Sequence, residues 1–393
     1  MRIGLVTTSY PQHESDTAGI FVRGFARTLV ALGHTVEVLA PEGIAAAQPP
    51  MDEGIELVPV PYLRPRSWQT TFYGAGVPDN IAAKPARALS AVPFVANLVR
   101  QLRKRGRGWD AVVSHWALPS ALVVGRVLES LPHLAVLHGG DVHALRRAPF
   151  SARFREEVAT HANVLWFVSA ELRNLYGETF GTESMVHAMG VDTPRGRDDA
   201  ARTPRAADAP FRMATMSRLV ELKGIDVALS AAKRQHHVSL SIAGDGPLRA
   251  SLAASIDSAS AVRLVGSVYG SAKEDFFRNA DVFVVPSRAT AGGREEGAPT
   301  TILEAMLRGI PVIGTRSGGI PEMITDGETG LLVPPNDAAA LADAVERLRS
   351  DSALREAIVK NARSFAERFT WPAMKPVVEH ALMRACARPA TTG

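Results

Sequence analysis

The sequence predicts an α/β fold with two domains, each built on a parallel sheet. Short, nearly continuous apolar runs alternate with helical patterns along the chain, which is typical of parallel strands covered by helices on both faces. At 393 residues the chain is too long for one ordinary hydrophobic core. The segment Thr193–Pro210 is rich in proline, alanine and mixed charge and lacks apolar periodicity, so we interpret it as an interdomain linker.

The apolar runs of the first half predict a first domain over residues 1–195. Helices fit between the expected strands, notably at Ile20–Leu32 and Ser120–Leu131. The strands are expected at Ile3–Thr7, Val36–Leu39, Ile55–Val58, Ala111–Val113, Leu134–Leu137 and Val164–Val168.

The same alternation restarts after the linker and predicts a second domain over residues 211–370. Its strands are expected at Met213–Met216, Leu240–Ala243, Val262–Val265, Val282–Val285 and Val312–Gly314, and its helices at Asp226–Lys233 and Thr301–Leu307. The tail from Asp337 is helical. Pro372 suits a first helical turn, so residues 371–393 form a separate last helix that can pack back on the first domain.

The composition describes a globular protein without obvious metal or disulfide chemistry. Hydrophobic residues make up 46% and charged residues 21%, and the net charge of +4 is too small to indicate nucleic acid. The single Cys386 excludes an internal disulfide and suits a reducing cytoplasm. Apolar stretches fall short of the ~20 residues of a membrane span, and the first residues do not form a secretory signal. We therefore expect a cytoplasmic protein.

The most informative stretch is residues 286–322, which reads as strand end, loop, helix and next strand. A run of small residues and a proline, Gly297, Ala298, Pro299, Thr300 and Thr301, precedes a helix, where exposed backbone N–H groups and the helix dipole favour an anion.

Two carboxylates bracket this helix start. Glu304 falls in the first turn, where it either chelates hydroxyls or simply favours the dipole as a capping residue. Glu296 lies in the loop and has no such structural explanation. Together they suit a phosphorylated, hydroxyl-rich ligand.

A second loop carries Arg218 and Lys223 after the strand Met213–Met216, before a helix that Asp226 could cap. Taken alone they read as solvated surface cations. Combined with the Glu296 loop they fit the grip of a diphosphate, with a chelating guanidinium and a point charge.

Other turns fall at strand ends, where parallel sheets bind ligands. The turn Gly244–Pro247 is structural in our interpretation, whereas the segment Gly266–Gly270 can offer backbone groups to a base. The loop Thr8–Gly19 is a further candidate phosphate contact.

In the first half, His138 and Asp141 follow a strand, and we expect them to face a cleft between the two domains. His138 can hydrogen-bond a sugar hydroxyl, and Asp141 is a candidate contact for the acceptor. We disfavour a metal site with Asp141 and His143 because polar loop residues commonly satisfy turns. His115 and Trp116 can stack on an acceptor, or Trp116 can be a half-buried aromatic.

The stretch Lys84–Trp109 surrounds an apolar segment with cations. It is either a solvated cationic helix face or an amphipathic helix lying on anionic lipid, so peripheral membrane contact is possible.

These residues together resemble the retaining glycosyltransferases of family 4, which have the GT-B fold of two Rossmann-like domains facing a cleft. The resemblance covers nearly the whole chain, and its specific part is Glu296-x₇-Glu304 with Gly297, Pro299 and Ala305-Met306. The weaker parts are Gly19, Gly33-His34-Thr35-Val36, His138-Gly-Gly-Asp141, Ser217-Arg218…Lys223-Gly224 and Gly244-Asp-Gly-Pro247.

The resemblance implies a role for each residue. Arg218 and Lys223 would hold the donor diphosphate, Glu304 the ribose and Glu296 the donor sugar. His138 would contact the sugar near its reacting carbon. Gly19 would approach the diphosphate, Val268 would pair with the base, and the amides of 297–301 would meet the distal phosphate or the sugar.

The chain departs from the family pattern in having Ser217 before Arg218 and a long loop between Ser287 and Glu296. It resembles transferases of bacterial exopolysaccharide and O-antigen assembly more weakly. No Asp-x-Asp occurs, so no metal or other cofactor is expected, and cations with helix dipoles must stabilise the leaving nucleotide.

The sequence therefore predicts a hexosyltransferase that uses a UDP- or GDP-linked sugar and a saccharide or lipid-linked acceptor. The alternatives are a sugar-nucleotide epimerase of the same fold, a non-catalytic sugar-nucleotide-binding protein, and a glycoside hydrolase. The last needs two carboxylates on opposite faces of one bond, ~5–9.5 Å apart, which two acids of one segment suit poorly.

Overall fold

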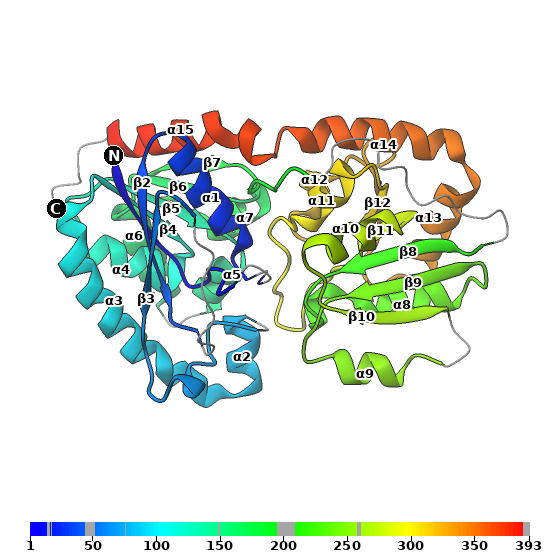
Figure 1. Ribbon diagram of the computed structural model, residues 1–393, viewed down its shortest axis with the longest axis horizontal. Coiled ribbons are helices and arrows are strands. Elements are labelled where there is room, and N and C mark those ends of the chain that lie inside the picture. Colours follow the sequence, from blue (N-terminus) through cyan, green and yellow to red (C-terminus); the bar gives the residue numbers. More distant parts are fainter. Residues whose placement is uncertain are drawn as a thin grey trace. The chain divides into compact units, whose positions relative to one another are not determined.

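A computed structural model describes residues 1–13, 16, 18–43, 52–74, 76–147, 150–194, 209–257 and 261–387 (Figure 1). The chain forms two compact units. The first unit runs from Met1 to Gly190 and includes the C-terminal segment from Trp371, and the second unit is Val191–Thr370. Most of the predicted linker, residues 195–208, lies outside the described residues.

The first unit contains a seven-stranded sheet whose described strands all pair in parallel, in the order β3-β2-β1-β4-β5-β6-β7. The strands are β1 Arg2–Val6, β2 Thr35–Pro41, β3 Ile55–Val60, β4 Ala111–His115, β5 His133–Leu137, β6 Val164–Phe167 and β7 Glu183–Val186. The helices are α1 Ile20–Ala31, α2 Val77–Ala83, α3 Ala91–Arg105, α4 Leu122–Val127, α5 Gly140–Arg147, α6 Ser151–Thr160 and α7 Ala170–Tyr176.

The second unit contains a six-stranded parallel sheet in the order β10-β9-β8-β11-β12-β13. Its strands are β8 Phe211–Met216, β9 Val238–Ala243, β10 Val262–Gly266, β11 Val282–Val285, β12 Val312–Thr315 and β13 Leu331–Val333. Its helices are α8 Ile225–Lys233, α9 Arg249–Ala254, α10 Gly270–Arg278, α11 Thr301–Leu307, α12 Ile320–Met323, α13 Ala338–Ser350 and α14 Ser352–Glu367.

Strand β11 shows why the apolar runs are continuous. Val282 and Val284 belong to the core on one face of the sheet, and Phe283 and Val285 belong to the core on the other face. Successive side chains of a strand point to opposite faces, so a strand covered on both sides must be apolar at every position.

The structure differs from the sequence predictions at one helix, at two strands that were not predicted and at one helix cap. The expected helix Ser120–Leu131 begins as a π turn at Ala117–Ala121 and continues as the shorter α4. Strand β7 was missed because Glu183–Val186 is only half-buried and lacks a continuous apolar run, and β13 was missed because it has only three residues. Asp226 does not cap α8, because the N-cap position is Gly224.

The last helix, α15, spans Trp371–Ala387 and belongs to the first unit. It contacts α1: a Cβ at Gly24 would lie 2.1 Å from the Trp371 ring, so only glycine lets the two helices approach this closely. Arg384 of α15 also pairs with Glu183 of β7 at 2.7 Å.

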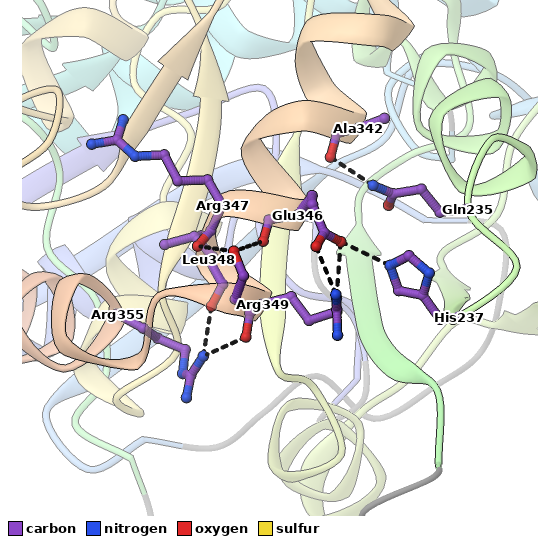
Figure 2. Close-up of polar contacts among 9 residues, drawn as sticks. Gln235, His237, Ala342, Glu346, Arg347, Leu348, Arg349 and Arg355 are labelled. Carbon is purple, nitrogen blue, oxygen red and sulfur yellow. Dashed lines mark hydrogen bonds and ion pairs between the residues drawn. The ribbon is translucent and has the colours of Figure 1, made fainter.

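Figure 2 shows polar contacts that join α13 to residues just before β9, and α14 to the end of α13. Glu346 contacts His237 at 2.8 Å and receives two hydrogen bonds from Arg349, and Gln235 donates to the carbonyl of Ala342. His237 immediately precedes β9, so this cluster lies at the amino end of the sheet.

None of the helices in the described part of the chain combines the length and apolar character that crossing a bilayer requires.

Candidate functional site

The order of the second sheet brings two predicted loops together. The chain proceeds outward from β8 through β9 to β10, and then returns to β11 on the other side of β8. Loops that follow two neighbouring strands at such a reversal point diverge and leave room for a ligand at the carboxyl ends. The loop after β8 carries Arg218 and Lys223, and the loop after β11 carries Glu296.

Lys223 and Glu296 form an ion pair across this reversal point. Lys223 Nζ lies 2.5 Å from Glu296 Oε1, and the side chains are 15% and 10% exposed. Ser287 Oγ donates to the same carboxylate oxygen at 3.4 Å. A buried carboxylate is therefore balanced by a cation from the neighbouring loop.

Gly224 allows the two loops to meet. It adopts a left-handed conformation with φ 58°, and a Cβ there would lie 2.0 Å from the carbonyl oxygen of Pro286. Arg288 of the second loop also donates its backbone N–H to the carbonyl of Leu222 at 2.9 Å. The Arg288 guanidinium forms an ion pair with Asp226. Asp226 thus links the loops rather than capping α8.

The glycine turn after β12 holds the backbone of Glu296. The N–H of Gly319 donates to the Glu296 carbonyl at 3.0 Å, and a Cβ at Gly318 would lie 2.2 Å from the same oxygen. Ser317 Oγ donates to the neighbouring Glu295 at 3.0 Å. Sequence reasoning did not assign this turn a role.

Glu304 contacts a lysine that the sequence did not single out. Its Oε2 lies 2.7 Å from Nζ of Lys273 in α10. The N-cap of α11 is Thr300, which makes no side-chain capping hydrogen bond, so the structure contains no capping box at this helix. The carboxylate of Glu304 is directed to Lys273 instead.

The residues between the two acids form a compact turn into α11. Gly297 and Pro299 are buried, whereas Ala298, Thr300 and Thr301 are partly exposed. The N–H of Ile302 donates to Pro299, and that of Glu304 to Thr300.

Arg218 is exposed, and the turn Gly244–Pro247 contacts the residues on either side of it. The N–H of Leu219 donates to the carbonyl of Asp245 at 2.8 Å, and a Cβ at Gly244 would lie 1.8 Å from the carbonyl oxygen of Ser217. The turn therefore has the structural role that we expected. Val268 is partly exposed after β10.

The first sheet has its own reversal point between β1 and β4, and the predicted residues of this unit gather there. His115 Nδ1 lies 2.8 Å from His138 Nε2, and the two rings stack at 5.1 Å. Phe21 and Trp116 lie 4.8 Å and 4.9 Å from the His138 ring.

Burial sets the protonation of the histidine pair. Loss of hydration lowers the pKa of His138 to about 3, although the residue is partly exposed. Burial, and then the neighbouring His138, lowers the pKa of His115 well below its ordinary value. Both rings are neutral near pH 7. His115 is fully buried and is better placed to orient His138 than to contact an acceptor.

Asp141 organises the loop that carries His138. Its carboxylate accepts hydrogen bonds from the N–H groups of Ala117 at 2.7 Å, Gly139 at 2.8 Å and His138 at 3.1 Å. Burial raises the pKa of the carboxyl group, and the backbone donors oppose that rise. Its predicted contact with an acceptor stays a prediction.

Gly19 lies at the N-cap of α1 with φ 69°, and a Cβ there would lie 2.3 Å from the carbonyl oxygen of Ser9. Only glycine fits this close approach. Among the described residues, no group of three or more His, Cys, Asp or Glu side chains is arranged to hold a metal ion.

Comparison with known proteins identifies the family. The family described as "Glycosyl transferases group 1" matches residues 197–365, and the one described as "Glycosyl transferase 4-like domain" matches residues 17–192. A GDP-mannose-dependent alpha-(1-6)-phosphatidylinositol monomannoside mannosyltransferase of Mycolicibacterium smegmatis is 30% identical over 292 residues, which are 69% of this chain and 75% of that protein. The chain belongs to the family 4 glycosyltransferases.

Other relatives extend the match over almost the whole glycosyltransferase. A putative teichuronic acid biosynthesis glycosyltransferase of Bacillus subtilis is 27% identical over 88% of this chain and 89% of its own length. The sucrose-phosphate synthase of Thermosynechococcus elongatus has a TM-score of 0.77 at 21% identity, with 98% of each chain covered. The HepE protein of Anabaena in complex with UDP has a TM-score of 0.71 at 17% identity, with 98% and 100% covered. These structures establish the GT-B fold.

The structure of this glycosyltransferase thus brings Lys223 together with Glu296, and His115 together with His138 and Trp116. The two acids contact different lysines: Glu296 contacts Lys223, and Glu304 contacts Lys273. Lys273 was missed because it belongs to no motif, and its position in the helix after the predicted base-binding segment was the only available signal.

Proposed function

We propose that this glycosyltransferase transfers a hexose, with retention of configuration, from a UDP- or GDP-linked donor to a hydroxyl of a saccharide or lipid-linked glycan. The observation that carries the proposal is the Lys223–Glu296 pair at the β8/β11 reversal point. It places a cation and a hydroxyl-binding carboxylate where a diphosphate and its sugar would meet.

Two relatives support a nucleotide-sugar donor without fixing the base. The mycobacterial mannosyltransferase is described as GDP-mannose-dependent, and the HepE structures contain UDP or UDP-glucose. Hydrogen bonds from backbone groups, such as those proposed for Val268, leave no side-chain signature that would distinguish uracil from guanine.

In the proposed donor complex, the diphosphate competes with Glu296 for the Lys223 ammonium. Two phosphates carry more charge than one carboxylate, so the ammonium moves toward the diphosphate and Glu296 becomes free to accept a hydrogen bond from the sugar. Arg218, exposed in the same loop as Lys223, adds a chelating guanidinium in this proposal. These cations stabilise the leaving nucleotide, and we propose that no metal bridges the diphosphate.

Glu304 and the small residues 297–301 complete the donor site in this proposal. Oε1 of Glu304 can accept hydrogen bonds from both hydroxyls of the ribose diol. The N–H groups of Gly297, Ala298, Thr300 and Thr301 contact the distal phosphate or the sugar.

His138 contacts the sugar as a neutral ring in the proposed mechanism. Because its pKa lies at about 3, it can accept or donate a hydrogen bond at pH 7 without adding charge. Gly19 approaches the diphosphate and Trp116 the acceptor; these roles in the first unit stay predictions.

The test is nucleotide binding combined with transfer. Calorimetry with UDP and GDP should show binding of one of them, and exhaustive chelation should leave transfer from the matching nucleotide-sugar intact. A strict requirement for a divalent cation would count against the metal-independent site. Conversion of the nucleotide-sugar without any acceptor would favour the epimerase alternative.

The segment 84–109 supports a proposed peripheral contact with an anionic membrane surface on the cytoplasmic side. It contains seven cations and no acidic residue. In the structure Phe94, Leu98 and Leu102 face the core, whereas Leu89 and Val92 are 74% and 71% exposed. Exposed apolar side chains beside cations are typical of interfacial helices.

Vesicle co-sedimentation tests this contact. The protein should sediment with vesicles that contain phosphatidylglycerol and stay in solution with phosphatidylcholine alone. The double variant Leu89→Ser and Val92→Ser should lose sedimentation, while Met383→Ser, which changes another exposed apolar residue of the first unit, should keep it. Equal sedimentation of both variants would remove the proposal.

A further inference from the structure

The carboxylate of Glu304 has a cation of its own, and that cation comes from another helix. Lys273 Nζ lies 2.7 Å from Glu304 Oε2, and the two side chains are 19% and 13% exposed. Among the described residues, Lys273 is the only side chain recorded against this carboxylate. A partly buried pair is screened less by salt than a surface pair.

Lys273 lies in the first turn of α10, and its N–H donates to the carbonyl of Tyr269 at 3.3 Å. This helix follows β10 and the segment 267–269, which is predicted to contact the base. The Lys273–Glu304 pair therefore links α10, which follows the predicted base-binding segment, to Glu304, which we propose contacts the ribose.

The packing of α10 against α11 does not depend on this pair. One residue further on, Glu274 accepts two hydrogen bonds from Arg308, at 2.8 Å and 2.6 Å. The Arg308 guanidinium also lies 4.6 Å over the ring of Phe277, which shares a core with residues of α11. Because these contacts already hold the helices, the Lys273 ammonium is available to act on the carboxylate itself.

We propose that Lys273 is a positioning residue that orients Glu304 for the ribose of the donor nucleotide. Its ammonium lies against Oε2, which is buried, and leaves Oε1 to accept hydrogen bonds from the 2′- and 3′-hydroxyls. It also offsets a negative charge that would otherwise repel the nearby diphosphate. The inference rests on the proposed function, in which Glu304 contacts the ribose.

The experiment compares nucleotides with and without the diol. Calorimetry measures the affinity for UDP and GDP and for their 2′,3′-dideoxy analogues in the wild type and in Lys273→Gln, Lys273→Arg and Glu304→Gln. In the wild type the diol should improve binding about tenfold. In Lys273→Gln the advantage should shrink to about twofold, and in Lys273→Arg, which keeps the charge, it should be partly restored.

Lys233→Gln is the matched control, since Lys233 pairs with Asp257 at 2.9 Å on the surface of the same unit. It should keep the full diol advantage. If Lys273→Gln keeps the advantage while Glu304→Gln loses it, the positioning role is wrong and the proposed ribose contact stands. If Glu304→Gln also keeps it, the ribose contact itself is wrong, and the positioning role falls with it.

Discussion

Lys223 Nζ lies 2.5 Å from Glu296 Oε1, so the cation proposed for the diphosphate and the carboxylate proposed for the sugar are bound to each other in this structure. The pair is mostly buried, and removing one partner of such a pair leaves an uncompensated charge. Ligand binding and charge balance at this site are therefore coupled, and substitution of each partner should have a different effect.

Glu296→Gln should abolish transfer without loss of nucleotide binding. The neutral amide keeps one acceptor oxygen but loses the negative charge, so it binds the sugar hydroxyl more weakly and turnover should fall at least about 100-fold. Lys223 is released from its partner and can bind the phosphates fully, so the affinity for the nucleotide should stay constant or rise. Radiolabelled transfer and calorimetry measure the two effects. Glu295→Gln, next in the chain, is the control, and wild-type turnover in Glu296→Gln would refute the assigned role.

Lys223→Ala should weaken nucleotide binding and lower turnover together. The ammonium contributes to the bound diphosphate and to the departing nucleotide, so both quantities should fall by about tenfold or more. The change also leaves Glu296 unpaired, and the double variant with Glu296→Gln separates that electrostatic effect. Unchanged affinity for both UDP and GDP in Lys223→Ala would show that the ammonium does not contact the diphosphate.

The main features of the fold follow from the sequence because buried parallel strands require apolar side chains on both faces. Strands such as β11 were therefore visible, whereas the half-buried β7 and the three-residue β13 had no comparable signal. Loop residues such as Lys223 were assigned by motif. Their partners were not, because ion pairs between helices, such as Lys273 with Glu304, depend on side-chain placement that no local pattern encodes.

Gly224→Ala should destabilise the second unit strongly. The new Cβ would lie 2.0 Å from the carbonyl oxygen of Pro286, and the residue would be held at φ 58°. Steric overlap and backbone strain together should cost about 3 kcal/mol, or about 6 °C or more in melting temperature. Gly327→Ala is the matched control, because it has φ 78° and no atom near its Cβ position. It should cost about 1 kcal/mol. Equal shifts in the two variants would show that the contact with Pro286 is not constraining.

Acid should destabilise the first unit, beginning below pH 6.5. Burial lowers the pKa of His133 to about 4 from an ordinary value of 6.5, and His115 shifts in the same direction. Between these values the unfolded chain binds protons that the folded chain does not, so stability falls as the pH falls. Each histidine should contribute a slope of at most about 1.4 kcal/mol per pH unit. The raised pKa of Asp141 opposes this trend only where that carboxyl group begins to bind a proton.

Urea unfolding of the first unit, followed between pH 7 and pH 5, measures this slope. His133→Gln should reduce it by about 1 kcal/mol per pH unit, because the amide does not titrate. His380→Gln, which changes an exposed histidine of the same unit, is the matched control variant. The wild-type midpoint should move to lower urea concentration at pH 5. If the midpoint does not move, the buried histidines bind protons in the folded state. That result would contradict the neutral His138 ring on which the proposed sugar contact depends.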